Sequence, residues 1–377
     1  MGMERQLLTR ERVQLVLGTL RQLVRNGGEM QQGIATSPQT CQHLQLTAAS
    51  CMLKLASLVH FDHVLNAADI SSLALVVQAP CYEVRSTFLL KKLIPSLVSW
   101  RVSVRFIPAL FMVAHDPETV LRDNVKHAVE LRLANVRPTP GSPSVVEESL
   151  CRLLFILAHH PDWDDSRIAD TLELFSRYIE FYIACVCVAQ NVSLLFCYAG
   201  EVKAYRNRQT VDALSKDVPN DTFTKRLYIL SELAQYLLRE KSTSSNWPVN
   251  VYPGKLTLPS DVFEPLGDAS ESSAVRAQPY LDPEFIKRRA KAPTAAQKRS
   301  RARPAGPSGP QSKRNRNASV SRGSKPSASR SKGKQAAGDE DDDGSDANDS
   351  DDSDIDGDVC MDDSDNAAED VEMSDEE

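Results

Sequence analysis

The stretch LFMVAHDP occupies residues 110–117, and LFILAHHP occupies residues 154–161. Aligned without a gap, the two stretches share Leu, Phe, Ala, His and Pro, and they begin 44 positions apart. Either the two segments assemble one histidine-based active site, or one structural unit occurs twice and each copy ends a helix at the same point.

The residues around the shared proline favour the structural interpretation. In the first copy Asp116 can cap a following helix, and Pro117 suits the first turn of that helix. In the second copy His160 takes the cap position before Pro161. The offset of 44 lies within the period of HEAT-type helical hairpins, which is ~40–47 residues. The repeat therefore predicts stacked helical hairpins.

The rest of the first 240 residues carries the same helical pattern. Leucine and other apolar residues recur at helical spacing in the segments 5–25, 40–60, 88–97, 121–131, 150–157, 168–186 and 227–237. No segment alternates over enough residues to predict a strand. The predicted fold class is all-α, a HEAT-like α-solenoid of about four or five hairpins that bury their apolar faces against one another.

The chain is predicted to divide into five segments. Four prolines between residues 246 and 266 exclude a continuous helix there, but the stretch is too apolar for a free linker. We expect it to form an extended arm along the last hairpins. The segments are a helix and loop at 1–40 whose place in the array stays open, hairpins at 41–245, a proline-punctuated arm with a short helix at 246–286, a disordered basic block at 287–335, and a disordered acidic tail at 336–377.

The net charge of −7 conceals two blocks of opposite charge. Residues 287–335 contain 16 Lys and Arg and no acid, and residues 336–377 contain 21 Asp and Glu and no Lys or Arg. These blocks have almost nothing apolar to bury, which predicts disorder. The first 286 residues are nearly neutral and apolar enough to build a core.

The basic block contains three clusters that are typical of nuclear-import signals or of contacts to DNA phosphates. A solubilising tail is the alternative. The candidate import or DNA-contacting residues are Lys287, Arg288, Arg289, Lys298, Arg299, Arg301, Arg303, Lys313, Arg314 and Arg316. The run Arg301-Ala302-Arg303-Pro304 resembles the core of an AT-hook, with Ala in place of Gly. We expect weak, salt-dependent attraction to DNA.

The acidic tail is expected to compete with DNA for the neighbouring cations. Ser353 and Ser374 each have an acid three residues on, so they are candidate sites for an acidophilic kinase. Phosphate groups there would add negative charge and strengthen the competition. An acidic tail of this kind could instead bind histones.

Several classes of protein are disfavoured by composition. The eight cysteines include no C-x-x-C pair, so we expect no metal ligand set. The N-terminus lacks an apolar signal core, and polar residues interrupt the most apolar stretch, 183–199, so we expect no membrane span. The composition predicts a soluble protein of a reducing compartment.

His115 and Asp116 are also compatible with one enzymatic alternative. Phosphohydrolases of the HD type are all-helical and place a His-Asp dyad at a divalent metal. The remaining ligands would have to come from His60 or His63 and from Asp162 or Asp165. However, the second copy has His-His in the aligned position, and no Gly-rich phosphate loop is present. We therefore predict no catalytic, cofactor-binding or metal-binding residues, and no enzymatic activity.

Longer stretches carry a resemblance to a known family. They are RYIEFY (177–182), NVSLLFCYAGEVKAYRN (191–207), LYILSELAQYLL (227–238) and YPGKLTLPSDVFEPL (252–266), and AHHPDW and YLDPEF also fit. Over residues 80–290 the chain resembles the C-terminal part of a fungal cohesin regulator, the fifth-named member of the precocious-dissociation-of-sisters cohesion factors.

The resemblance implies a non-catalytic HEAT-repeat protein that binds the kleisin subunit of cohesin and controls the establishment and release of cohesion. It also implies a nuclear, chromatin-associated role in mitosis and in DNA repair. Family members are several times longer, and their kleisin contacts lie mostly in the middle of the spine, so we transfer no kleisin-binding residue. The predicted function is therefore cohesin regulation; a histone-binding scaffold is the alternative, and an HD-type phosphohydrolase is a remote one.

Overall fold

Helices dominate the computed structural model, which describes residues 2–30, 36–59, 61–134, 136–137, 142–208 and 220–291. The α-helices are α1 (Gly2–Arg25), α2 (Pro38–Ala56), α3 (Ala67–Val76), α4 (Tyr82–Ser86), α5 (Ile94–Val98), α6 (Thr119–Ala128), α7 (Val145–Ala158), α8 (Ile168–Val186), α9 (Val192–Glu201), α10 (Asn220–Ser245), α11 (Ala269–Ala277) and α12 (Pro283–Lys291). The 3₁₀ segments are η1 (Asp62–Val64), η3 (Val104–His115), η5 (Asp165–Arg167) and η6 (Val202–Ala204). The π-helical segments are η2 (Thr87–Leu93) and η4 (Val129–Leu133), and the strands are β1 (Tyr205–Asn207) and β2 (Phe263–Pro265).

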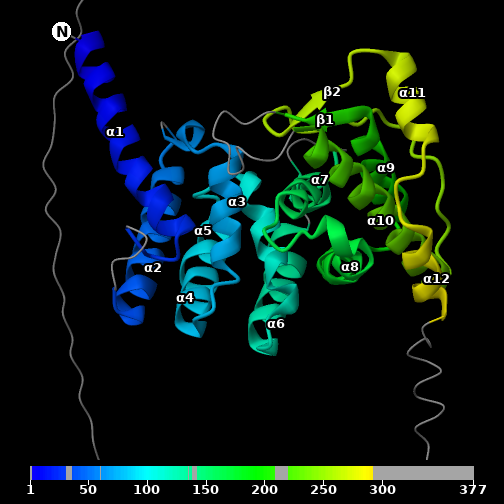
Figure 1. Cartoon of the computed structure of the whole chain (residues 1–377), viewed down its shortest axis with the longest axis horizontal. Helices are drawn as coiled ribbons and strands as arrows, with labels where there is room; N and C mark the ends of the chain where they lie inside the picture. The colour runs from blue at the N-terminus through cyan, green and yellow to red at the C-terminus, as the bar shows by residue number, and fades with distance from the viewer. Residues whose placement is uncertain are drawn as a thin grey trace, which may run out of the picture. The chain divides into compact units, whose positions relative to one another are not determined.

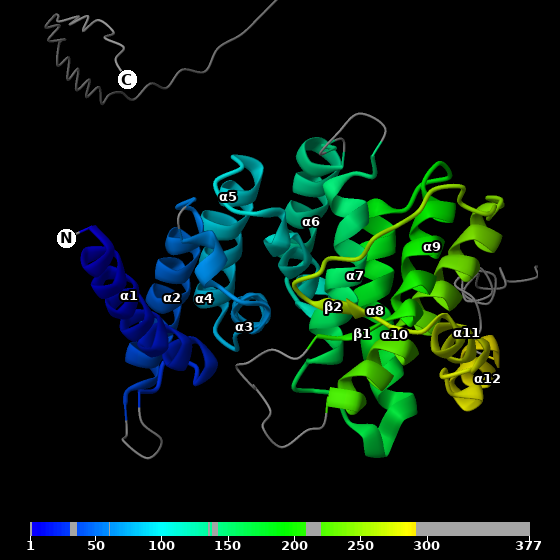
Figure 2. The same ribbon diagram turned by 90° about the horizontal axis from the view of Figure 1, so that it is seen from above.

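The helices lie side by side in a row (Figures 1 and 2). Helix α1 packs on α2 and α3, and α3 packs on η3, which also contacts α7 and α8. Helix α10 contacts α7, α8 and α9. One hydrophobic cluster continues from Leu17 in α1 to Phe285 in α12. The predicted α-solenoid is confirmed, because successive helices share one core along the row.

The two related octapeptides form different kinds of helix. Residues 154–161 end helix α7 at Ala158, as predicted. Residues 110–117 instead end η3, a 3₁₀ segment in which every residue from Phe106 to Val113 is buried. Pro108 lies inside this segment, has no N–H to donate and clashes with the preceding turn of a regular α-helix. Each copy therefore ends a helical segment, but the first segment is a 3₁₀ helix and the second an α-helix.

The corners after the two octapeptides share a turn, but neither is a helix cap. Helix α6 begins at Thr119 and α8 at Ile168, so Asp116 and His160 lie too early to cap them. Each side chain instead accepts a hydrogen bond from the backbone two residues on. Asp116 Oδ1 accepts from the N–H of Glu118 at 2.8 Å, and His160 Nδ1 accepts from the N–H of Asp162 at 3.1 Å. The aligned position thus has one local role in both copies.

Buried polar side chains tie α7 to the helices that follow it. Ser144 and Glu147 form a reciprocal capping box at the start of α7. The second oxygen of Glu147 accepts from Asn191 Nδ2 at 3.0 Å, and Tyr182 Oη donates to the carbonyl of Val146 at 2.9 Å. The groups that begin α7 therefore also fix α8 and the start of α9.

Two short strands were not predicted. Strand β1 pairs antiparallel with β2, with Asn207 opposite Phe263 and Tyr205 opposite Pro265. Each strand has three residues, too few to display the period-two alternation by which a strand is recognised in a sequence. Pro265 at the end of β2 is compatible with a two-stranded pair, in which both strands are edges.

The segment from Asn246 to Asp268 forms no α-helix and crosses the last hairpins (Figure 2). Leu258, Val262 and Phe263 are buried in the shared core. Arg152 of α7 holds this arm through both of its terminal nitrogens, which donate to the two oxygens of Asp261 at 2.7 and 2.8 Å. A bidentate arginine–carboxylate pair fixes the relative orientation of the two side chains and also attracts them to each other.

The helical part extends further than expected at its C-terminal side. Helix α12 continues to Lys291, so the first five residues of the block expected to be disordered are helical. The rest of the basic block and the whole acidic tail, for which disorder was expected, lie outside the described residues.

Among the helices that the structure describes, none is both long and apolar enough to cross a membrane.

The anchoring of the arm gives a stability prediction. Phe263 is 1% exposed, so Phe263→Ala should lower the free energy of unfolding by about 3 kcal/mol through lost burial and a residual cavity. Val251 in the same arm is 94% exposed, so Val251→Ala should change it by less than about 0.5 kcal/mol. Urea unfolding of both variants makes the comparison, and equal losses would show that the arm is not docked through Phe263.

Candidate functional site

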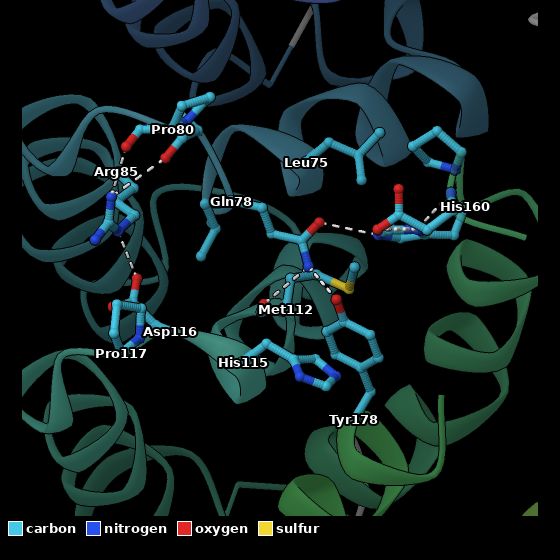
Figure 3. Close-up of a pocket in the computed structure, with 14 residues that line it drawn as sticks. Leu75, Gln78, Pro80, Arg85, Met112, His115, Asp116, Pro117, His160 and Tyr178 are labelled. Carbon is cyan, nitrogen blue, oxygen red and sulfur yellow. Dashed lines mark hydrogen bonds and ion pairs between the residues drawn. The ribbon is translucent and has the colours of Figure 1, made fainter. Parts of the chain in front are cut away.

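The two proline corners meet at one cavity of about 590 Å³. Its walls come from the end of α3 and the loop after it, Arg85 of α4, the end of η3, the corner after α7 and helix α8 (Figure 3). The residues that line it are Leu75, Val77, Gln78, Ala79, Pro80, Arg85, Met112, His115, Asp116, Pro117, His160, Pro161, Asp162 and Tyr178. Convergence of the corners is what the active-site interpretation requires, so the chemistry of these residues has to decide between the two interpretations.

Gln78 is the centre of the polar network in this cavity (Figure 3). Its Nε2 donates to the carbonyl of Met112 at 3.1 Å and to Tyr178 Oη at 2.6 Å. Its Oε1 lies 2.9 Å from His160 Nε2. Both polar atoms of the amide are thus occupied, and one side chain joins the first octapeptide, the second corner and helix α8.

The partners of His160 fix its tautomer. Nδ1 accepts from the backbone N–H of Asp162, so the proton resides on Nε2 and is donated to Gln78 Oε1. Burial lowers the pKa of His160 to about 4, despite the opposing effect of the Asp162 carboxylate. Burial likewise raises the pKa of Tyr178 to about 12. Both groups are neutral near pH 7, where they act as hydrogen-bonding groups.

The aligned histidines of the two octapeptides face different surroundings. His115 Nε2 donates to the carbonyl of Leu174 at 3.0 Å, and burial lowers its pKa. His159 Nδ1 donates to the carbonyl of Phe155 at 2.9 Å, and its ring stacks on Phe223 with centroids 4.2 Å apart. Burial lowers the pKa of His159 to about 4. The two rings therefore do not form one catalytic pair.

Asp116 is held by an ion pair beside the cavity. Arg85 Nε donates to Asp116 Oδ2 at 2.6 Å, and the two side chains are 12% and 3% exposed. Arg85 Nη1 also donates to the carbonyls of Ala79 and Pro80, and Arg122 donates to the carbonyl of Asp116. Arg85 balances the charge of the Asp116 carboxylate, and both carboxylate oxygens already accept hydrogen bonds. The carboxylate is therefore not free to bind a metal ion.

Those residues of the phosphohydrolase alternative that the structure describes do not assemble into a metal site. Among the described residues, no three or more His, Cys, Asp and Glu side chains are placed to hold a metal ion. His60 lies outside those residues. Asp165 accepts from Trp163 Nε1 at 2.7 Å and pairs with Arg226 at 2.6 Å. The polar groups of the cavity are used to join repeats, which favours the structural interpretation of the octapeptides.

The candidate basic residues fall into two groups. Lys287, Arg288 and Arg289 lie on helix α12, where Arg289 contacts Glu180 and Glu240. The other seven residues and both candidate phosphorylation sites lie outside the described part of the chain. They are Lys298, Arg299, Arg301, Arg303, Lys313, Arg314, Arg316, Ser353 and Ser374.

Sequence reasoning missed Gln78 and Tyr178. A signal for the first was present, since Gln78 is the one polar residue in the run Leu73–Pro80. No comparable signal marked Tyr178, which sits in an amphipathic stripe that also predicts ordinary core packing. The sequence also gave no sign that Arg85 pairs with Asp116, because this pairing depends on a contact between separate elements.

Comparison with known proteins gives one consistent family. The model of the family described as "Sister chromatid cohesion protein PDS5 protein" matches residues 2–264. The chain is 27% identical over 270 residues to "Sister chromatid cohesion protein PDS5" of Saccharomyces cerevisiae, which covers 66% of this chain and 21% of that protein. It is 26% identical over 270 residues to the Schizosaccharomyces pombe protein of the same description, covering 72% of this chain and 21% of that protein. Against the Homo sapiens homolog A, the identity is 24% over 231 residues, or 58% of this chain and 17% of that protein.

The chain thus spans about a fifth of the length of the curated relatives it matches. The matched range includes the cavity between the proline corners and the docked part of the arm.

The lowered pKa values predict acid sensitivity. His159 and His160 have a pKa of about 4 in the folded protein, against about 6.5 for an unperturbed histidine. Between these values the unfolded chain binds more protons, so their stabilising contribution is complete above about pH 6.5 and is lost as the pH falls towards 4. At pH 5 the loss amounts to about 2 kcal/mol for each histidine.

His159→Phe should reduce this loss, because the ring against Phe223 is kept while the titrating group is removed. Urea unfolding at pH 7, 6 and 5 should show a fall in stability that is smaller than in the original chain by about 2 kcal/mol at pH 5. His127→Gln, which removes a histidine at an exposed position of α6, is the control. Identical pH profiles for both variants would contradict the assignment.

Proposed function

Because the chain belongs to the PDS5 family of sister chromatid cohesion proteins, we propose that it regulates cohesion by binding cohesin and not by catalysing a reaction. The observation that carries this proposal is the family match over residues 2–264, which spans nearly all of the helical array and the arm docked on it. A nuclear, chromatin-associated location and roles in mitosis and DNA repair form part of the same proposal.

The chemistry of the corner cavity supports a binding role. His115, His160 and Tyr178 each make hydrogen bonds within the protein, and Asp116 is neutralised by Arg85. Groups engaged in this way hold repeats in register and are not poised as acid, base or nucleophile. An array of helices, by contrast, offers an extended surface on which a partner chain can lie.

The kleisin subunit is the partner that we propose within cohesin. The relatives are named as cohesion proteins, and the chain matches about a fifth of their length, so binding by this chain has to be measured directly. A histone-binding scaffold is the second candidate function. It is favoured by the 21 acidic residues of positions 336–377, which complement a strongly basic partner.

We also propose that the basic block attracts DNA and that the acidic tail weakens this attraction. The block carries 16 Lys and Arg, and 21 acids follow it directly in the chain. Each phosphate neutralised by the block should add about −0.9 to the slope of log affinity against log salt. Phosphorylation at Ser353 and Ser374 would increase the negative charge and strengthen the competition.

Capture of purified complexes tests the first proposal. The immobilised full chain should retain cohesin that contains its kleisin subunit, and it should retain less of a preparation from which the kleisin has been omitted. Histones offered at the same ionic strength are the comparison. Retention of histones without cohesin would replace the first candidate function by the second.

Removal of the acidic residues tests the proposed competition. The chain that ends at residue 337 should bind duplex DNA more tightly than the full chain at low salt, because fewer internal acids compete for the basic block. Fluorescence anisotropy over a salt series measures both affinity and slope. Equal affinity of the two chains would mean that the tail does not restrain the block.

A further inference from the structure

Helix α12 lies near the end of the array (Figure 1) and packs against α8. Phe285 is 1% exposed and lies edge-on to Tyr236, with ring centroids 6.4 Å apart. Before the helix, the backbone N–H groups of Tyr280 and Leu281 donate to Glu232 Oε2 at 2.7 and 2.6 Å. The helix is therefore docked along one side through Phe285 and at its start through Glu232.

The basic end of α12 meets carboxylates from α8 and α10. Arg289 Nε donates to Glu240 Oε2 at 2.9 Å, and its Nη2 contacts Glu180. Arg288 Nη1 lies 3.2 Å from Asp170 Oδ1. Two consecutive arginines of α12 thus pair with three acids that belong to two other helices.

Lys287, Arg288 and Arg289 of α12 differ in how strongly acids of the protein already bind them. Within the part of the chain that the structure describes, Lys287 pairs with Glu284 of its own helix alone, at 3.3 Å, and its side chain is 65% exposed. The Arg288 side chain is 64% exposed, whereas that of Arg289 is 17% exposed between its two acids. A phosphate group cannot reach the guanidinium of Arg289 while both carboxylates hold it. The basic motif KRRAK (residues 287–291) is thus only partly available to bind phosphate groups in this arrangement.

We propose that α12 is a latch on its own basic cluster, in which Arg288 and Arg289 bind either the carboxylates of α8 and α10 or a phosphate polyanion. Because the same guanidinium groups serve both, binding of a polyanion to them releases the end of α12 from the body. The three internal acids thereby set the affinity of the cluster. This inference rests on the DNA attraction proposed above and is independent of cohesin binding.

The test loosens the latch without altering the cluster. In the full chain, Glu180→Gln/Glu240→Gln removes both acids that hold Arg289. Backbone amides of α12 should then exchange hydrogen for deuterium faster than in the original chain. Affinity for duplex DNA should rise, and the slope of log affinity against log salt should steepen by about 1–2, as one or two more arginines reach phosphates.

A matched control separates the latch from simple loss of negative charge. Glu173→Gln/Glu130→Gln removes the same charge at two exposed acids on α8 and η4 that make no ion pair within the described residues. This variant should leave the exchange of α12 and the salt slope unchanged. In chains that carry Arg288→Ala/Arg289→Ala, the Glu180 and Glu240 substitutions should no longer raise the affinity.

Each outcome decides the inference. Unchanged exchange of α12 in Glu180→Gln/Glu240→Gln would exclude a latch. Faster exchange with unchanged DNA affinity and slope would mean that the α12 arginines do not contact phosphates, while DNA binding by residues 298–316 would stand. Heparin used beside DNA shows whether any polyanion suffices. Failure of both polyanions to bind any variant would overturn the inference together with the proposed DNA attraction, and would leave cohesin binding unaffected.

Discussion

The structure depends on the burial of η3, a helical segment covered on every side. From Phe106 to Val113 each residue is buried, and the segment contacts α3, α7 and α8. A segment of this kind has no surface of its own, so it is stable only when the preceding and following helices are present together. The same constraint explains why one hydrophobic cluster runs along the array without dividing into separate cores.

Polar groups near the centre of the array fix how neighbouring helices are aligned with one another. Gln78 links three separate elements through one amide. At the adjacent corner, Arg85 balances the negative charge of Asp116. These groups contribute to stability only while their partners are present, because an unpaired buried polar group is costly. The cavity between the corners is therefore a joint between repeats, and its histidines serve as neutral hydrogen-bonding groups.

Much of the fold was predictable from local signals. Apolar stripes of helical period marked α1, α2, α7, α8 and α10, and the repeated corner marked the array itself. Local signals failed where a contact with a distant element decided the outcome. Pro108 and its buried neighbours select a 3₁₀ segment, β1 and β2 exist only as a pair, and Arg289 finds its acids on two other helices. Of the candidate site, the sequence indicated the two corners, whereas the position of Tyr178 required the packed structure.

The placement of the arm and α12 over the final hairpin has a consequence for self-association. A helical array that ended in a bare apolar face would present a surface that a second molecule could extend, and repetition of that contact would give open-ended filaments. Here Phe285 comes from outside the hairpins and packs against Tyr236 of α10, and the arginines of α12 give its outer side a charged character. End-to-end polymerisation through this end of the array is thereby disfavoured.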